Sequence, residues 1–503
     1  MWETVLSNFL SIDSLIALVV GVVGGMVIGA LPGLNATMAI SLLIPITYTM
    51  PPYAAFLMMM AVYTSAFYGG SLTAILIHTP GTPSSAATAG DGYALTQKGR
   101  GLEAMGMSTV ASMIGGAMSG IALLTLAPLL GKVTLLFSAP EYFLIVILGL
   151  SIIGGLGGES SVVKGYLMGV FGLLLGCIGT DTITGQLRFT FGYMGLYSGI
   201  STVPALIGLF SISQAMVLAE KHLAFKRGER REIDEKALKG KFLPTGKEMI
   251  RYIPNFIRSG IIGIIVGILP GAGGDIGAWF AYSQAKKASK HPEEFGNGAI
   301  EGICASETAN NAVTGGSVIP LITLGIPGST VAAVLLGAMI MHGLTPGRSM
   351  FDKNLATTNT IIVGFIVANL MMGLIGMLIC RQVIKITKVS DAVLIPVIVV
   401  LSTIGSFAIN NRISDVYMML AFGLIGYLCR KVKLPTAPII LGLLLEGMGE
   451  EGFKNAILMA KNTPVLQFYL GRPVSVVLII LLAATIVYPI ISKVIKSARK
   501  KKV

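Results

Sequence analysis

The sequence predicts an all-α polytopic membrane protein with about 12 transmembrane helices, arranged as two inverted repeats with broken or re-entrant helices. The first observation is composition, since only 12% of the 503 residues are charged and 53% are hydrophobic. A soluble domain carries about a quarter charged residues. The second is a series of apolar stretches of membrane-spanning length, and the third is a glycine-proline motif that occurs twice. Most of the surface must therefore face lipid.

The apolar stretches fall into two kinds. The uninterrupted kind is close to the roughly 20 residues that cross a hydrocarbon core. Clear candidate spans lie near 104–127, 134–156, 162–178, 357–380, 391–409, 413–429 and 474–492. Others are interrupted by Gly and Pro, at 15–50, 53–90, 255–283 and 308–345.

Charge is distributed unevenly along the chain. No Lys or Arg precedes Lys98, one basic cluster lies between Lys221 and Arg258, and another covers Lys493 to Lys502. Basic residues beside spans orient a chain with those loops inside. We expect the central loop and the C-terminus to be cytoplasmic, in a bacterial-type inner membrane. A nucleic-acid partner is not predicted, because the clusters lack interleaved aromatic residues.

The charged interval divides the chain into three predicted parts. Residues 1–219 form a first membrane repeat, 220–252 a cytoplasmic linker, and 253–503 a second repeat with C-terminal spans and a basic cytoplasmic tail. If the N-terminus lies outside and the linker inside, the second half starts on the opposite side from the first. That arrangement is an inverted repeat.

The two halves share a motif order. Gly29-Ala30-Leu31-Pro32-Gly33 ends an apolar run in the first half, and Gly267-Ile268-Leu269-Pro270-Gly271 ends one in the second. Further along, Gly69-Gly70-Ser71 precedes Pro80-Gly81-Thr82, and Gly315-Gly316-Ser317 precedes Pro327-Gly328-Ser329. Pro removes a backbone donor and Gly allows unusual dihedral angles, so the helices should unwind at these places.

Paired breaks at matching positions of two halves indicate a binding site near the membrane midplane. Unwound backbone offers N–H groups to anions and carbonyls to cations. Hydroxyl and amide side chains are numerous beside both breaks, including the adjacent Asn310 and Asn311. Two neighbouring amides point in different directions on a helix, so one can face the site while the other packs. Glu301 and Glu307 precede this pair and could help to bind a cation.

An enzyme is not predicted. The sequence contains no nucleophile elbow, no His-Glu-x-x-His pair and no P-loop, which also removes direct use of ATP. The four cysteines lie far apart and indicate neither a metal site nor a disulfide framework. We expect no cofactor beyond a coupling ion.

The chain resembles the large membrane subunit of the tripartite tricarboxylate transporters over nearly its whole length. The most specific stretches are GALPGLNATMAISLLIPITYTM at 29–50, YGGSLTAILIHTPGTPSSAATAGDGYAL at 68–95, GTDTITGQLRFTFG at 179–192, the long segment from GILPGAGG to GIPGS at 267–329, and HGLTPG at 342–347. Three residues depart from the expected pattern: His78 where Asn is common, Asp275 after a usually less charged break, and Glu446 near Glu450-Glu451.

The resemblance implies ion-gradient-driven import, by Na⁺ or H⁺ symport, of a tri- or dicarboxylate such as citrate. It also implies an elevator-like mechanism, a small four-span membrane subunit and a periplasmic solute-binding protein. The rivals are an anion channel and a membrane scaffold or receptor that does not transport.

The two breaks and the asparagine pair would form the site in this interpretation. Substrate contacts are expected from Asn35, Ser71, Thr73, Gly81, Thr82, Ser84, Asn310, Asn311, Ser317, Gly328 and Ser329. Cation contacts are expected from Gly33, Asn35, Pro80, Gly271, Asn310 and Pro327.

Overall fold

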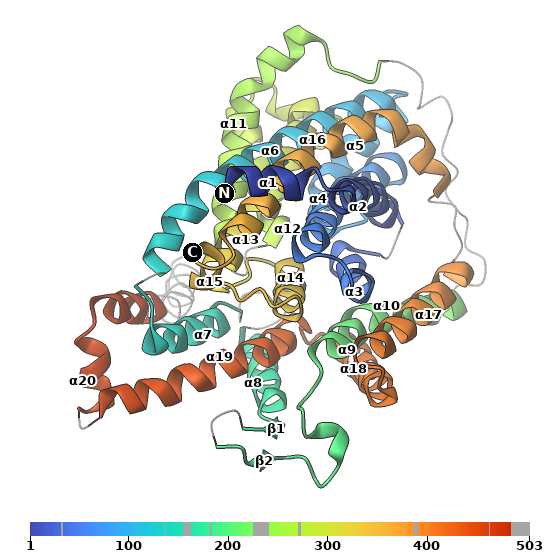
Figure 1. Cartoon of the computed structure of the whole chain (residues 1–503). Helices are drawn as coiled ribbons and strands as arrows, with labels where there is room; N and C mark the ends of the chain where they lie inside the picture. The colour runs from blue at the N-terminus through green and yellow to red at the C-terminus, as the bar shows by residue number, and fades with distance from the viewer. Residues whose placement is uncertain are drawn as a thin grey trace, which may run out of the picture. The chain divides into compact units, whose positions relative to one another are not determined.

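The structure is a computed structural model of the chain and is almost entirely helical (Figure 1). It describes residues 1–31, 34–134, 136–153, 162–181, 184–224, 241–269, 273–386, 391–461 and 463–483. The prediction of an all-α polytopic fold is confirmed. Within these residues, eight helices are long and apolar enough to cross a membrane. They are Ile12–Ala30, Pro52–Ile77, Gly101–Thr134, Thr202–Glu220, Gly246–Ile268, Leu355–Ile379, Ala392–Asn410 and Ile413–Lys431. Shorter apolar helices are Ala36–Thr47, Ala139–Ser151, Val163–Gly176, Thr330–Met341 and Pro473–Ala483.

The chain forms two compact units. Unit 1 comprises Met1–Leu129 and Val203–Leu428, and unit 2 comprises Leu130–Thr202 and Cys429–Val503. Each unit draws on both halves of the sequence, so the units differ from the predicted parts 1–219, 220–252 and 253–503. Those repeat boundaries stay a prediction. Much of the predicted linker (225–240) and the basic tail (484–503) lie outside the described residues.

Unit 1 contains most of the helices. Its elements are α1 (Trp2–Phe9), α2 (Ile12–Ala30), α3 (Ala36–Thr47), α4 (Pro52–Ile77), η1 (Pro83–Ser85), α5 (Ala86–Gln97), most of α6 (Gly101–Thr134), α9 (Thr202–Leu206), η4 (Ile207–Ile212), α10 (Ser213–Ala224), α11 (Gly246–Ile268), α12 (Gly273–Ala288), η6 (Pro292–Glu294), α13 (Ile300–Leu324), α14 (Thr330–Met341), α15 (Arg348–Phe351), α16 (Leu355–Ile386), α17 (Asp391–Asn410) and most of α18 (Ile413–Lys431).

Helix α2 packs backbone to backbone on α4 through glycines spaced four residues apart. A Cβ atom on Gly21 would lie 2.6 Å from the Met58 carbonyl oxygen, and one on Gly29 would lie 2.1 Å from that of Ala66. Gly25 makes the same kind of contact between them. Small residues at this spacing allow the close approach that drives helix association in lipid. Any larger side chain here would force the two helices apart.

Helices α11 and α13 repeat this contact in the second half. A Cβ atom on Gly263 would lie 2.5 Å from the Ala309 carbonyl oxygen, and one on Gly267 would lie 2.7 Å from that of Val313. The glycine at the end of each first helix, Gly29 or Gly267, precedes the first Pro-Gly motif of its half. The two halves therefore share a helix pair as well as a motif order.

Both long helices end in a left-handed residue before the second Pro-Gly motif. Helix α4 ends at His78 with φ 54°, and α13 ends at Gly325 with φ 72°. The chain then turns back onto its own helix pair. A Cβ on Gly81 would lie 2.2 Å from the Gly29 carbonyl oxygen, and one on Gly328 would lie 2.4 Å from the Gly267 carbonyl oxygen. Only glycine fits at these two crossings, which fixes the position of both breaks.

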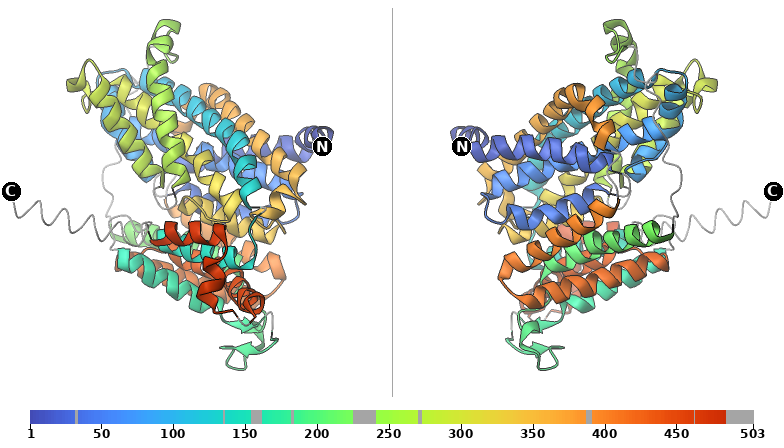
Figure 2. Two further views of the ribbon diagram at one scale, coloured as in Figure 1. Left: turned by 90° about the vertical axis from the view of Figure 1, so that its left-hand side faces the viewer. Right: turned by 90° about the vertical axis from the view of Figure 1, so that its right-hand side faces the viewer.

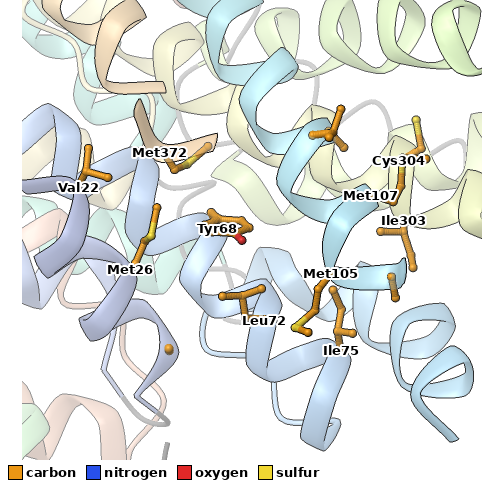
Figure 3. Packing of buried hydrophobic residues seen from close by; sticks show 14 of the residues in the cluster. Val22, Met26, Tyr68, Leu72, Ile75, Met105, Met107, Ile303, Cys304 and Met372 are labelled. Carbon is orange, nitrogen blue, oxygen red and sulfur yellow. The ribbon is translucent and has the colours of Figure 1, made fainter. Parts of the chain in front are cut away.

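The apolar core of unit 1 lies around α4. Tyr68 and Leu72 of α4 pack with Met26 of α2, Met105 of α6 and Met372 of α16 (Figure 3). Ile303 and Cys304 of α13 belong to the same cluster. Both halves of the sequence thus contribute to one continuous core inside unit 1.

Unit 2 contains α7 (Ala139–Ile153), α8 (Val162–Gly176), a β1–β2 hairpin (Gly179–Thr180 and Leu187–Arg188), η3 (Met194–Leu196), α19 (Ala437–Ala460) and α20 (Val465–Leu470). Helices α7 and α8 pack against α19 (Figure 2). The hairpin is tied to α19 by Arg188, whose guanidinium lies 2.6 Å from Glu450. In the same unit, Arg472 pairs with the buried Glu141 at 2.7 Å. These two ion pairs therefore join separate elements of unit 2 to one another.

Candidate substrate and ion site

The N-termini of two short helices meet inside unit 1. Asn35 caps α3 by accepting the Met38 N–H at 2.9 Å, and Ser329 caps α14 by accepting the Ala332 N–H at 3.1 Å. The hydroxyl groups of Thr37 and Thr330, in the first turns of these helices, lie 3.3 Å apart. A helix N-terminus carries a partial positive charge and N–H groups without helical partners. Two such ends side by side can bind an anion.

Tyr63 of α4 connects the second break to the first half. Its hydroxyl lies 2.9 Å from Ser317 of α13 and 2.9 Å from Ser329 at the start of α14. The residue is fully buried. Ser317 also donates to the Thr314 carbonyl oxygen at 2.9 Å. The two serines predicted as substrate ligands therefore lie together, and an aromatic residue that was not predicted holds them.

The first break carries its own cluster of hydroxyl groups. Thr82 and Ser84 lie 3.1 Å apart, and Ser85 accepts the Thr82 N–H at 3.3 Å at the start of η1. The Gly81 N–H donates to the Gly70 carbonyl oxygen at 3.1 Å. Thr73 donates to the same carbonyl at 3.0 Å. These bonds order the turn, with Thr82, Ser84 and Ser85 buried beneath it.

The adjacent asparagines of α13 behave differently although both are fully buried. Asn311 donates through Nδ2 to the Thr64 hydroxyl at 2.9 Å. Among the residues that the structure describes, neither amide atom of Asn310 has a hydrogen-bond partner, and the same is true of the Asn311 Oδ1 and the Ser65 Oγ. Buried polar atoms are almost always paired. The unpaired amide atoms on α13 are therefore the strongest indication of a ligand position.

A polar stripe runs along one side of α13. Glu307, Asn310, Thr314 and Ser317 follow one another at helical spacing, so they share a face. Ten residues of helix cover about 15 Å, which is the length of the stripe from Glu307 to Ser317. Glu307 was noted in the sequence as a possible aid to cation binding but was not included among the site residues. The spacing of three or four residues between successive members of the stripe is the sequence signal that could have placed Glu307 among the site residues.

The remaining predicted residues are placed as follows. Ser71 is buried on α4, where it faces Glu307, and Gly328 and Pro327 are buried at the second break. Pro80 is exposed, and Gly81 and Asn35 are partly exposed. Gly33 and Gly271 lie outside the described residues. The second break and the N-terminus of α3 are thus brought together. The exposed Pro80, by contrast, does not face the buried hydroxyl groups.

The fold and this site define a multi-pass membrane protein whose centre is built where broken helices from two halves meet. Comparison with known families is consistent with that class. Residues 15–441 match the family described as the tripartite tricarboxylate transporter TctA family. The chain belongs to this family, as the sequence resemblance predicted.

Two relatives are from Agrobacterium vitis. One, an uncharacterized 52.8 kDa protein in the TAR-I ttuC' 3' region, is 38% identical over 483 residues, covering 96% of this chain and 94% of the relative. The other, an uncharacterized protein in the TAR-II ttuC' 3' region, is 36% identical over 200 residues, covering 40% of this chain and 83% of the relative. No solved structure matches the chain significantly.

Proposed function

We propose that this chain is the large membrane subunit of a secondary transporter that uses an ion gradient to import small carboxylates. Tri- and dicarboxylates such as citrate are the expected substrates. A periplasmic solute-binding protein delivers them, and a small four-span membrane subunit completes the system. The chain lies in a bacterial inner membrane with its C-terminus in the cytoplasm, an orientation that the basic tail favours.

The observation that carries this proposal is the meeting of the α3 and α14 N-termini. Their free N–H groups and the hydroxyl groups of Thr37 and Thr330 are suited to carboxylate oxygens. Tyr63, Ser317 and Ser329 lie beside this place, and the unpaired Asn310 lies on the same face of α13 as Ser317. A carboxylate bound there would be enclosed by residues from both halves, as expected for a site at the interface of two repeats.

The test is uptake of a panel of radiolabelled carboxylates into proteoliposomes that contain this chain, its small subunit and its binding protein. An inward Na⁺ gradient, an inward proton gradient and no gradient are compared. Saturable accumulation that needs both a gradient and the binding protein is the expected result. Equilibration that ignores the gradient would identify an anion channel, and absence of any flux would favour a scaffold.

A further inference from the structure

Glu307 of α13 is a fully buried carboxyl group among hydroxyl groups from three other helices. Thr88 of α5 donates to one carboxyl oxygen. Ser108 and Ser112 of α6 lie 3.2 and 3.1 Å from the other oxygen. Ser71 of α4 also faces this carboxyl group. The side chain therefore sits where α4, α5 and α6 of the first half enclose α13 of the second.

No ion pair with Lys, Arg or His compensates this carboxyl group within the part of the chain that the structure describes. Taking an unpaired carboxylate out of water costs several kcal/mol even after relaxation. Ionisable residues inside membrane helices are for this reason rare and mark ion pathways or proton relays. The group requires either a bound cation or a proton of its own.

The surroundings favour a proton over a metal cation. A hard cation takes several oxygen ligands, commonly including free backbone carbonyls. Helix α13 is continuous from Ile300 to Leu324, so the carbonyl groups beside Glu307 are engaged in the helix. The partners that the structure gives Glu307 are side-chain hydroxyl groups, each of which can donate one hydrogen bond as well as accept.

These hydroxyl groups form a chain that can accommodate both protonation states. Thr88 lies 2.7 Å from Ser306, and Ser306 donates to the Gly302 carbonyl oxygen at 3.0 Å. When Glu307 is protonated, it donates to Thr88, which donates to Ser306. When Glu307 is ionised, Thr88 turns its proton to the carboxylate, joined by Ser108 and Ser112. Only hydroxyl rotation separates the two states, so no helix must repack.

Other titratable or charged groups on the surrounding helices are engaged elsewhere. On the helices of the first half, Tyr68 bonds Thr109, Asp91 accepts from Tyr282 and from the backbone N–H groups of Gly296, Gly298 and Ala299, and Glu103 pairs with Arg100. On α11 and α13, Arg258 bonds Asn255, and Cys304 contacts Asn255 and Thr308. Glu301 accepts a hydrogen bond from Ser289. Among the described acids of these helices, Glu307 is the fully buried one whose partners are all Ser and Thr hydroxyl groups. Glu301 also accepts from a hydroxyl group but is only partly buried.

We propose that the Glu307 carboxyl group binds the coupling proton of this transporter. The inference rests on the proposed import function and adds the identity of the ion and of its site. It places the ion about three residues along the stripe from Asn310, instead of at the Pro-Gly breaks as the sequence predicted. Loading of Glu307 would remove a buried negative charge before an anionic substrate enters the same unit.

The experiment compares Glu307→Gln with wild type in the reconstituted three-component system. Glutamine has nearly the same shape but cannot release a proton. We expect accumulation driven by a proton gradient to be lost, so that the inside concentration does not exceed the outside one. Exchange of internal for external labelled substrate, which needs no net proton movement, is expected to continue. Glu307→Asp should restore part of the accumulation.

The control is Glu103→Gln, the same change at a partly exposed acid of α6 that pairs with Arg100, which should accumulate substrate as wild type does. Proton-driven accumulation by Glu307→Gln, or Na⁺-driven accumulation by wild type at zero pH gradient, would overturn the proposal. Wild type that neither accumulates nor exchanges any carboxylate would instead contradict the import function.

Infrared spectroscopy tests the protonation of Glu307 without a transport measurement. A protonated-carboxyl band present in wild type and missing from Glu307→Gln supports the proposal, and identical spectra overturn it.

Discussion

The two halves of unit 1 have the same backbone contacts. In the first half, the glycine of the first break, Gly81, rests on the Gly29 carbonyl oxygen and on Gly70. In the second half, Gly328 rests on the Gly267 carbonyl oxygen and on Ser317. In each half, the helix pair that makes this contact, α2–α4 or α11–α13, is joined by glycines four residues apart. The scaffold that opens a helix at membrane depth is therefore present twice.

Their side chains differ at the centre. Alignment of Gly69-Gly70-Ser71 with Gly315-Gly316-Ser317 sets Ala61 opposite Glu307, Tyr63 opposite Ala309, and Thr64 opposite Asn310. The first half contributes a phenol and a hydroxyl group, whereas the second contributes an acid and an unpaired amide. The comparison shows that a duplicated backbone can carry chemistry that is not duplicated. Substitutions of the glycines that both halves share should therefore affect folding. Substitutions of the polar residues that only one half carries should affect transport.

The largest effect is expected from Gly29→Ala. The new Cβ would meet the Ala66 carbonyl oxygen at 2.1 Å, so α2 and α4 must separate. We expect a loss of about 3 kcal/mol of stability, seen as aggregation in detergent on size-exclusion chromatography. Gly267→Ala should behave in the same way in the second half.

Gly24→Ala is the matched control on the same helix, because nothing lies within 4 Å of its added Cβ. It should stay within about 1 kcal/mol of wild type. Equal damage from Gly24→Ala and Gly29→Ala would mean that helix propensity, not the close contact, decides the fold.

Asn310→Ala tests a polar residue that only the second half carries. Hydrogen bonds to charged groups contribute about 1.5–3 kcal/mol, so uptake should fall about ten- to a hundredfold. The melting temperature should stay constant or rise, because two buried amide atoms without protein partners are removed.

Asn255→Ala provides the contrast. Asn255 donates to the Glu301 carbonyl oxygen at 2.9 Å and accepts from Arg258 at 2.8 Å, so its loss should lower the melting temperature with little change in uptake. If Asn310→Ala melts earlier and still transports normally, its amide is a structural group.

The smallest effect is expected from Tyr63→Phe. It removes the hydroxyl between Ser317 and Ser329, at a cost of about 1 kcal/mol in stability. If these serines hold substrate, the KM for uptake should rise about fivefold, the equivalent of the same energy. Tyr68→Phe, which loses a 2.7 Å bond to Thr109, should show the loss in stability with an unchanged KM.

Sequence patterns predicted the helical membrane fold and located both Pro-Gly breaks. The breaks could be located because Pro and Gly alter the conformation of their own backbone. The membrane fold could be predicted because long apolar runs are stable only when they face lipid or the protein interior. The pattern also selected Ser317 and Ser329, which lie beside a break in the chain itself. In the sequence, the glycines of α2 and α11 stand out only as interruptions of the apolar stretches 15–50 and 255–283, although their four-residue spacing defines the packed helix pairs.

Contacts between distant segments could not be predicted. Tyr63 in an apolar run is typical of a core residue, and nothing near it in the sequence points to Ser329. Glu307 was noted beside the asparagine pair, but its partners Thr88, Ser108 and Ser112 come from the other half of the chain. A one-dimensional pattern cannot show which hydroxyl groups surround a carboxyl group, so this cluster required the fold.

The glycine contacts also bear on how the protein is made. Helices α2 and α4 are separated in the chain only by α3, and α11 and α13 only by α12 and the short η6. In lipid, helices insert first and associate afterwards through close packing. Each glycine-joined pair can therefore assemble as soon as its own segment leaves the ribosome. The contact of Tyr63 with Ser317 and Ser329 must wait for the second pair, so the two halves can be completed as separate pieces before the site between them exists.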